Sequence, residues 1–189
     1  MTAVTKEWDE ADDVALLRRL RADESGAITT LMRRYTESLL RFALYLVGSR
    51  DAAEDIVQHV FVQLWERRAI IDPECHLKPY LFRSVRNRAL DEQDALGVRN
   101  RYRDHIQADA AAGAVLSLVP NPEEAILTET MVQAALDRLP ERRRIAVRLR
   151  LMESMTHAEI ANVLGITPVA AQSLVTRGIA DLKKIIWRA

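Results

Sequence analysis

The stretch THAEIANVLGITP, from Thr156 to Pro168, contains the signals for a helix, a tight turn and the start of a second helix. The hydroxyl of Thr156 can cap the first helix while Glu159, three residues later, returns a hydrogen bond as a capping box. Gly165 stands where that helix must end, and glycine readily adopts the positive φ of such a turn. Thr167 can then cap the second helix, with Pro168 at its first position. This order of signals predicts a helix-turn-helix.

The second helix of this motif has one apolar face and one polar face. Its apolar face follows alternating steps of four and three, at Ala171, Val175, Gly178, Leu182 and Ile185. The other face carries small and hydrogen-bonding side chains, which suit the major groove of DNA. The predicted DNA-binding residues are Pro168, Ala170, Gln172, Ser173, Thr176 and Arg177. A helical hairpin that only packs is the alternative, but it does not account for the caps, the glycine turn and the polar face together.

Composition bounds the class of protein. The chain has 189 residues, 49% of them hydrophobic, which suits one large or two small domains. Its one cysteine, Cys75, excludes an intramolecular disulfide, and Cys75 with His76 lacks further ligands at zinc-like spacing, so we expect no metal and no cofactor. The acidic, mixed N-terminus and the lack of a long apolar run predict a cytoplasmic protein without membrane insertion. The formal net charge of zero predicts weak binding to DNA alone.

Helical periodicity continues through the rest of the chain, and no alternating strand pattern is visible. We expect helices at Asp12–Arg21, Ala27–Val47, Asp51–Arg68, from about Lys78 to between Asp94 and Arg103, at Asn121–Arg138, and from Leu139 to near Glu153. Asp51 can cap the third of these helices. The Ala- and Gly-rich stretch Gln107–Val119 is typical of a linker. The sequence therefore predicts an all-α fold of two small helical domains, residues 1–103 and 121–189, joined by a flexible linker at residues 104–120.

Two further motifs lie on either side of this linker. The segments AEDIVQHVFVQLW at Ala53–Trp65 and YLFRSVRN at Tyr80–Asn87 resemble region 2 of the extracytoplasmic-function (ECF) sigma factors. The segment LDRLPERRR at Leu136–Arg144, followed by the helix-turn-helix, resembles region 4 of the same family. The resemblance covers most of the chain, from about Ala27 to Ile186. It implies a subunit that binds core RNA polymerase, directs it to specific promoters and assists promoter opening, without catalytic chemistry of its own.

The resemblance also implies a role for each group of residues. The residues implied to dock on the β′ clamp helices of core polymerase are Asp55, Gln58, His59, Val62 and Trp65. The residues implied to hold the opened minus-ten element are Arg83, Arg86, Asn87 and Arg88, next to a base-capturing loop at about Ile70–Leu77. Region 4 would approach the β flap and read the minus-thirty-five element of promoter DNA, with Arg142, Arg143 and Arg144 near phosphate. An anti-sigma factor is a further implied partner.

Apolar residues beside these groups have another expected use. We assign Phe61 and Leu64 to the core, and we expect Tyr80 and Phe82 to be core residues rather than platforms for unstacked bases. The chain also departs from the family pattern, because Gln172-Ser173-Leu174 stands where Lys-Ser-Arg is common. The loss of two positive charges predicts DNA contacts that are less electrostatic, or a different promoter.

Two other classes of protein fit the sequence less well. A conventional transcriptional regulator would use a similar helix-turn-helix to bind duplex DNA without core polymerase. Such a regulator would carry a sensing domain, and the all-helical pattern argues against an α/β receiver. An enzyme would need a nucleophile–base pair or a phosphate loop, and neither is visible, while the four histidines are scattered over separate segments.

Overall fold

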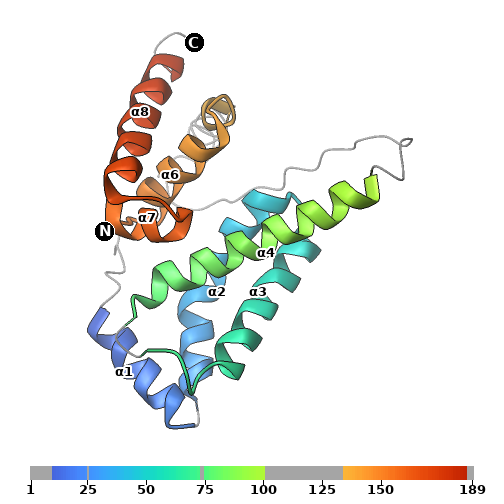
Figure 1. Cartoon of the computed structure of the whole chain (residues 1–189), viewed down its shortest axis with the longest axis vertical. Helices are drawn as coiled ribbons and strands as arrows, with labels where there is room; N and C mark the ends of the chain where they lie inside the picture. The colour runs from blue at the N-terminus through green and yellow to red at the C-terminus, as the bar shows by residue number, and fades with distance from the viewer. Residues whose placement is uncertain (1–9, 25, 73–74, 101–133, 187–189) are drawn as a thin grey trace, which may run out of the picture. The chain divides into compact units, whose positions relative to one another are not determined.

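The computed structural model describes residues 10–24, 26–72, 75–100 and 134–186 (Figure 1). Within these residues the regular structure is entirely helical, which confirms the predicted all-α class. The chain divides into two compact units, Met1–Ala111 and Ala112–Ala189. The predicted linker and the start of the helix expected at Asn121 lie outside the described residues.

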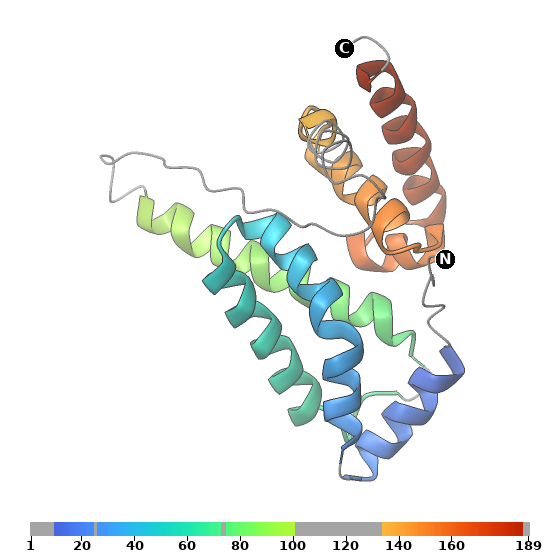
Figure 2. The same ribbon diagram turned by 180° about the vertical axis from the view of Figure 1, so that it is seen from behind.

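The described residues of unit 1 form a bundle of four helices, seen from two sides in Figures 1 and 2. They are α1 (Glu10–Arg21), α2 (Ala27–Val47), α3 (Arg50–Glu66) and α4 (Leu77–Asn100). Helix α2 packs against the other three, and α3 also packs against α4. The apolar stripe of α2 is buried at Leu31, Tyr35, Leu39 and Phe42 and half-buried at Leu46. All four helices begin and end within two residues of the bounds predicted from the sequence, and the end of α4 lies inside its predicted range.

Local signals set the break between α2 and α3. Gly48 ends α2 in the left-handed region, with φ 70°, and its N–H donates to the carbonyl of Leu44. Ser49 caps α3, since its Oγ accepts a hydrogen bond from the N–H of Ala52 at 3.4 Å. The prediction of Asp51 as the cap is therefore wrong: Asp51 lies inside the first turn, where its charge still favours the positive end of the helix.

A buried carboxylate joins α1 to α2. Asp13 is almost fully buried, and the guanidinium of Arg34 donates to its Oδ1 at 2.5 Å. The hydroxyl of Tyr35 donates to the other oxygen of Asp13. Burial opposes the charge on Arg34, but its hydrogen bonds and ion pairs with Asp13 and Asp12 outweigh burial and raise the pKa of Arg34. We call Asp13, Arg34 and Tyr35 the α1 clasp; its charges are compensated, as buried charges must be.

Unit 2 contains α6 (Glu141–Met152), α7 (His157–Leu164) and α8 (Pro168–Ile186), preceded by helical residues 134–137. Both α6 and α7 pack against α8. One part of the core comprises Ala135, Leu136, Leu139, Val147 and Leu182. Helices α6 and α8 approach closely at Gly178, where an added Cβ would lie 2.4 Å from Cγ2 of Val147. The lack of a side chain at Gly178 therefore sets how near the two helices can lie.

Candidate nucleic-acid and protein-binding surfaces

The helix-turn-helix forms as its sequence signals predict. The N–H of Glu159 donates to Oγ1 of Thr156 at 3.2 Å, and the N–H of Thr156 donates to the Glu159 carboxylate at 2.7 Å. Gly165 ends α7 with φ 66°, and the N–H of Ala170 donates to Oγ1 of Thr167 at 3.3 Å. The capping box, the glycine turn and the second cap are thus all confirmed. Together they set the sharp bend of 103° between α7 and α8.

Helix α8 separates a core face from an outer face. The residues of its core face that are buried are Ala171, Val175, Gly178 and Leu182, while Ile185 is half-buried. On the outer face Pro168, Gln172, Thr176 and Arg177 are exposed, and Ala170 and Ser173 are half-buried. All six predicted DNA-binding residues therefore lie outside the core of unit 2. The first turn of α8 contains no acidic side chain that would repel phosphate.

The outer face of α8 includes one residue that the sequence prediction left out. Val169 is 76% exposed, and among the large apolar side chains that the structure describes only Ile70, at 81%, is more exposed. Val169 precedes Ser173 by four residues and Thr176 by seven, so the three share one stripe of the helix. The spacing of four and three was the signal available in the sequence. It was missed because valine is expected in a core.

The structure divides the arginine cluster at the start of α6. Arg142 is exposed. Arg143 donates to Asp181 of α8 at 2.7 Å, and Arg144 donates to Asp137 at 3.4 Å. Two of the three predicted phosphate ligands therefore have carboxylate partners inside unit 2. Arg143 in particular links α6 to α8, a contact within unit 2 that the prediction of phosphate binding did not consider.

Helix α3 presents the residues that were predicted to contact polymerase. Asp55, Gln58, Val62 and Trp65 are exposed, and His59 is half-buried. They recur at steps of three and four and so form one stripe. The buried side of α3 comprises Ala53, Ile56, Val57, Val60, Phe61 and Leu64. The assignment of Phe61 and Leu64 to the core is therefore confirmed, and the α3 stripe lies outside that core.

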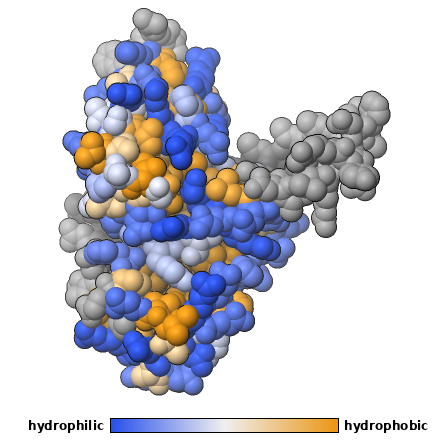
Figure 3. Space-filling model, in the orientation of Figure 1, coloured by the Kyte–Doolittle hydropathy of each residue, from blue (hydrophilic) through white to orange (hydrophobic). Residues whose placement is uncertain are grey.

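Trp65 is held in a defined position at the end of this stripe. The guanidinium of Arg68 lies over its ring, 4.1 Å from the centroid, in a cation–π contact. Arg68 in turn donates to Asp23, between α1 and α2, at 3.1 Å. Trp65 remains 37% exposed and Val62 52% exposed. Apolar surface thus accompanies the polar groups of the α3 stripe. On the face of the molecule drawn in Figure 3, orange hydrophobic patches lie among blue hydrophilic residues.

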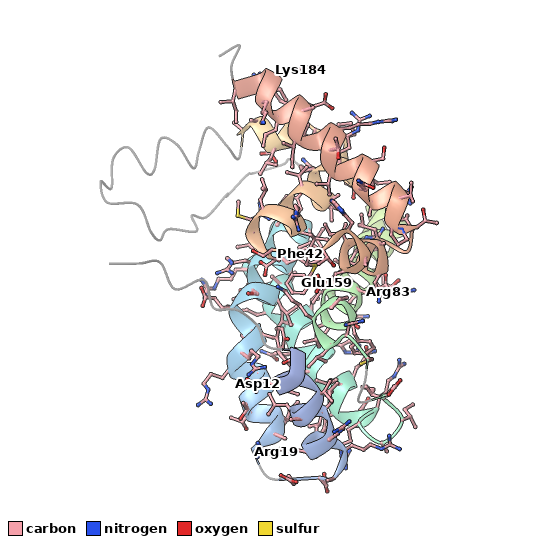
Figure 4. All side chains as sticks on the ribbon, turned by 90° about the vertical axis from the view of Figure 1, so that its left-hand side faces the viewer. Asp12, Arg19, Phe42, Arg83, Glu159 and Lys184 are labelled. Carbon is pink, nitrogen blue, oxygen red and sulfur yellow. The ribbon has the colours of Figure 1, made fainter. Side chains whose placement is uncertain are left out.

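Helix α4 carries the basic residues predicted for the minus-ten element. Arg83, Asn87 and Arg88 are exposed and Arg86 is half-buried; Figure 4 labels Arg83 on α4 and Phe42 on α2. Asn87 follows Arg83 by four residues, so both lie on one face. Phe82 is fully buried, with its ring centroid 5.2 Å from that of Phe42. Phe82 is a core residue as predicted, while Tyr80 is only half-buried.

The described residues contain no group of three histidine, cysteine or acidic side chains placed to hold a metal ion. Cys75 is half-buried, and burial, followed by the nearby charges of Asp72 and Asp13, raises the pKa of its thiol. Across the described residues no single helix has the length and apolar character to cross a membrane; α7 and α8 meet that test only as a pair bent by 103°.

Comparison with known proteins identifies the two units. Residues 31–96 match the family model for Sigma-70 region 2, and residues 129–182 match that for Sigma-70, region 4. The chain is 25% identical to the ECF RNA polymerase sigma factor SigL of Mycobacterium tuberculosis, over 86% of this chain and 90% of the relative. It is 28% identical to the RNA polymerase sigma factor NccH of Alcaligenes xylosoxydans xylosoxydans, over 94% of this chain and 96% of that relative.

Solved structures share the fold. CnrH in complex with the cytosolic domain of CnrY matches with a TM-score of 0.66 and 22% identity, over 94% of this chain and 97% of that one. RpoE of Bartonella quintana, in complex with the anti-sigma factor NepR, matches with a TM-score of 0.66 and 21% identity, over 85% and 97%. The two region models together match well over half of the chain, in the predicted order. The chain therefore belongs to the sigma-70 family and is an RNA polymerase sigma factor of the ECF type.

Proposed function

We propose that this sigma factor binds core RNA polymerase through the α3 stripe, holds the opened minus-ten element on α4, and reads the minus-thirty-five element with the outer face of α8. One observation carries the proposal: in each helix the predicted contact residues lie outside the core that the same helix builds. Each surface is therefore available to a partner without any loss of packing.

The α3 stripe has the composition of a protein-binding surface. Exposed Val62 and Trp65 supply apolar area, and Asp55 and Gln58 supply groups that form directional hydrogen bonds. A partner helix in a groove or across a face contacts residues at such steps of three and four. The β′ clamp helices of core polymerase are the proposed partner. Trp65, already held by Arg68, would lose little side-chain entropy on docking.

The α4 surface suits single-stranded DNA. Arg83 and Arg88 are exposed cations that can neutralise phosphates, and Asn87 can form hydrogen bonds with a base edge. Because Phe82 is fully buried, the stacking of an unpaired base on its ring is not part of this proposal. Tyr80 is half-buried and not a core residue, contrary to the expectation from the sequence, and it has no stacking role in this proposal. Contacts to the minus-ten strand would rest mainly on charge and hydrogen bonds.

The α8 surface suits duplex DNA. The first turns of a recognition helix contact base edges in the major groove, and Gln172 can pair there with adenine. Arg177 supplies one exposed cation on the outer face, and Arg142 supplies another at the start of α6. Arg143 and Arg144, which already pair with carboxylates, would contribute less to phosphate binding than Arg142. A small number of cationic contacts predicts a weak dependence of this contact on salt.

The protein would act where core polymerase is found, in the cytoplasm, without a cofactor or catalytic chemistry of its own. We also propose an anti-sigma factor as a partner, supported by two solved complexes of similar fold: the sigma factor RpoE with the anti-sigma factor NepR, and CnrH with the cytosolic domain of CnrY. The β flap of polymerase is the proposed partner of unit 2. The anti-sigma factor and core polymerase would compete for the exposed surfaces of the sigma factor.

The decisive experiment is run-off transcription with purified core polymerase on a promoter library, with and without this protein. New start sites that depend on the protein are the expected result. Val62→Asp places a charge in the α3 stripe and should reduce core binding at least tenfold, whereas Glu37→Gln, at an exposed position of α2, is the matched surface control. Failure to initiate or to bind core, together with specific binding to duplex DNA, would instead favour a conventional regulator.

A further inference from the structure

The second residue of α8 has an exposed apolar side chain that the packing of unit 2 does not use. Val169 is 76% exposed, whereas Ala171, two residues later, is fully buried. Valine is a weaker helix former than alanine, and its exposure to water stabilises nothing in the isolated unit. The fold of unit 2 therefore supplies no reason for a large apolar group at this position.

The position of Val169 is defined by its helix. Thr167 directly precedes α8 and caps it, and Pro168, the first residue of the helix, has a fixed φ. The backbone of this turn is therefore well specified. A β-branched side chain in a helix has one strongly preferred rotamer. Val169 consequently presents two methyl groups in a fixed direction. Little conformational entropy would be lost if those methyl groups were covered by a ligand.

The neighbours of Val169 indicate what would cover it. Ser173 and Thr176 share its stripe, and both belong to the surface proposed to read the minus-thirty-five element. The residues around it in the first turn, Pro168 and Ala170, are short, so the helix end can approach the floor of a groove closely. In the major groove, thymine is the one base of the four standard DNA bases that presents a methyl group, and apolar side chains recognise it by contact.

We infer that Val169 is a specificity-determining residue that recognises the C5-methyl group of a thymine in the minus-thirty-five element. This inference rests on the proposed function, because it requires α8 to lie in the major groove. It adds a contact that depends on shape and burial, not on charge. Such a contact also fits a recognition helix in which Gln172, Ser173 and Leu174 carry no positive charge.

Deoxyuridine provides the test, because it differs from thymidine only by the missing methyl group. Once run-off transcription has identified a promoter, each thymine of its minus-thirty-five element is replaced singly by uracil, and binding by the holoenzyme is measured. At one position the wild-type holoenzyme should lose affinity by about three- to fivefold, the value of one buried methyl group. Val169→Ala should bind the thymine promoter more weakly by a similar factor and show no further loss with uracil at that position.

Two features keep this experiment interpretable. Val169→Ala removes an exposed side chain and introduces a better helix former, so it leaves no cavity and α8 should form normally. Leu151→Ala truncates an exposed apolar residue of α6 in the same unit and should retain the wild-type response to every uracil. The two variants together separate loss of a specific contact from a general loss of apolar surface.

The possible failures are distinguishable. If the wild-type holoenzyme initiates at no promoter, the proposed function fails before any uracil template is used. If it initiates but no uracil substitution affects binding, or if Val169→Ala retains the full uracil effect, the inference about Val169 is wrong while the proposed function stands. An effect of Val169→Ala on core binding with an unchanged uracil response would overturn the inference in favour of a protein contact.

Discussion

The two units hold their helices together by different means. Unit 1 relies on large side chains and on the α1 clasp, in which Asp13 accepts hydrogen bonds from Arg34 and Tyr35 across two helices. Unit 2 relies on close backbone approach at Gly178 and on short local caps such as Thr156 with Glu159. Unit 2 also has a distant polar contact, from Arg143 of α6 to Asp181 of α8, but that pair is half-exposed, whereas Asp13 of the α1 clasp is buried. The difference shows that the polar contact between helices can be part of a core, as in unit 1, or can lie beside a close backbone approach, as in unit 2.

The tight packing of unit 2 should be the feature most sensitive to change. Gly178→Val would place side-chain atoms where Cγ2 of Val147 already lies, 2.4 Å from an added Cβ, so α6 and α8 must separate. We expect the free energy of unfolding of unit 2 to fall by about 3 kcal/mol. Hydrogen exchange in the full chain, followed separately in peptides of each unit, would measure the loss.

The same position offers its own control. Gly178→Ala combined with Val147→Ala removes the atom that an added Cβ would meet, so protection of unit 2 should be better in the double variant than the sum of the two single changes predicts. Additive effects would show that the approach of α6 to α8 is not limited at this contact. Exchange in unit 1 should stay the same in all these variants.

The α1 clasp should rank second. Asp13→Asn removes the charge facing Arg34 and leaves a buried guanidinium only partly compensated by Asp12. Because Arg34 retains some contact with solvent, we expect a loss of about 2 kcal/mol, below the range for a fully buried pair. The measurement is exchange in α1 and α2, with Glu37→Gln, which breaks an exposed pair with Arg41, as the control of small effect.

The clasp should also have a defined dependence on pH. Since the pKa of Arg34 is raised in the folded protein, its charge contributes stability that is present at all pH values below its unfolded pKa and is lost only in strongly alkaline solution. Exchange-derived stability of α1 should therefore not fall between neutral and moderately alkaline pH on account of Arg34. A loss centred in that range would contradict the ion pair.

The helix caps should give a smaller effect and a comparison between units. Thr156→Ala removes the capping hydroxyl, which is one half of the capping box. We therefore expect the free energy of unfolding of unit 2 to fall by about 1 kcal/mol. Ser49→Ala removes a single longer hydrogen bond, 3.4 Å, from unit 1 and should cost less. Exchange in the first turns of α7 and α3 would compare the two directly, and a larger effect at Ser49 would reverse the proposed difference.

The smallest expected effect concerns Cys75 in unit 1. Its raised thiol pKa, caused first by burial and then by Asp72 and Asp13, predicts that alkylation at neutral pH is slower than for a free cysteine. Asp72→Asn removes the second of these causes and should accelerate alkylation modestly, with burial left unchanged. The rate of carbamidomethylation as a function of pH is the measurement. An alkylation rate equal to that of a model thiol would show that Cys75 is not shielded.

Much of the candidate site could be predicted from the sequence because its signals are local. The outer face of α8 and the stripe of α3 follow from helical periodicity, which separates exposed from buried positions wherever the apolar residues recur regularly. Val169 was missing from the predicted DNA-binding residues because valine is expected in a core. Its exposure depends on which other residues pack nearby, and the sequence does not show that. The pairing of Arg143 with Asp181 escaped for a related reason, since the two residues are 38 positions apart.

By itself the sequence determined the described helices of unit 1 to within two residues, the caps of α7 and α8, the glycine turn of the helix-turn-helix and the family to which the two regions belong. These features depend on hydrogen bonds and periodicities that span only a few residues. Only the tertiary structure decided that Asp13 is a buried partner of Arg34 and Tyr35, and that Gly178 marks the close approach of α6 and α8. Such contacts join residues distant in the chain, and their existence depends on how whole helices pack.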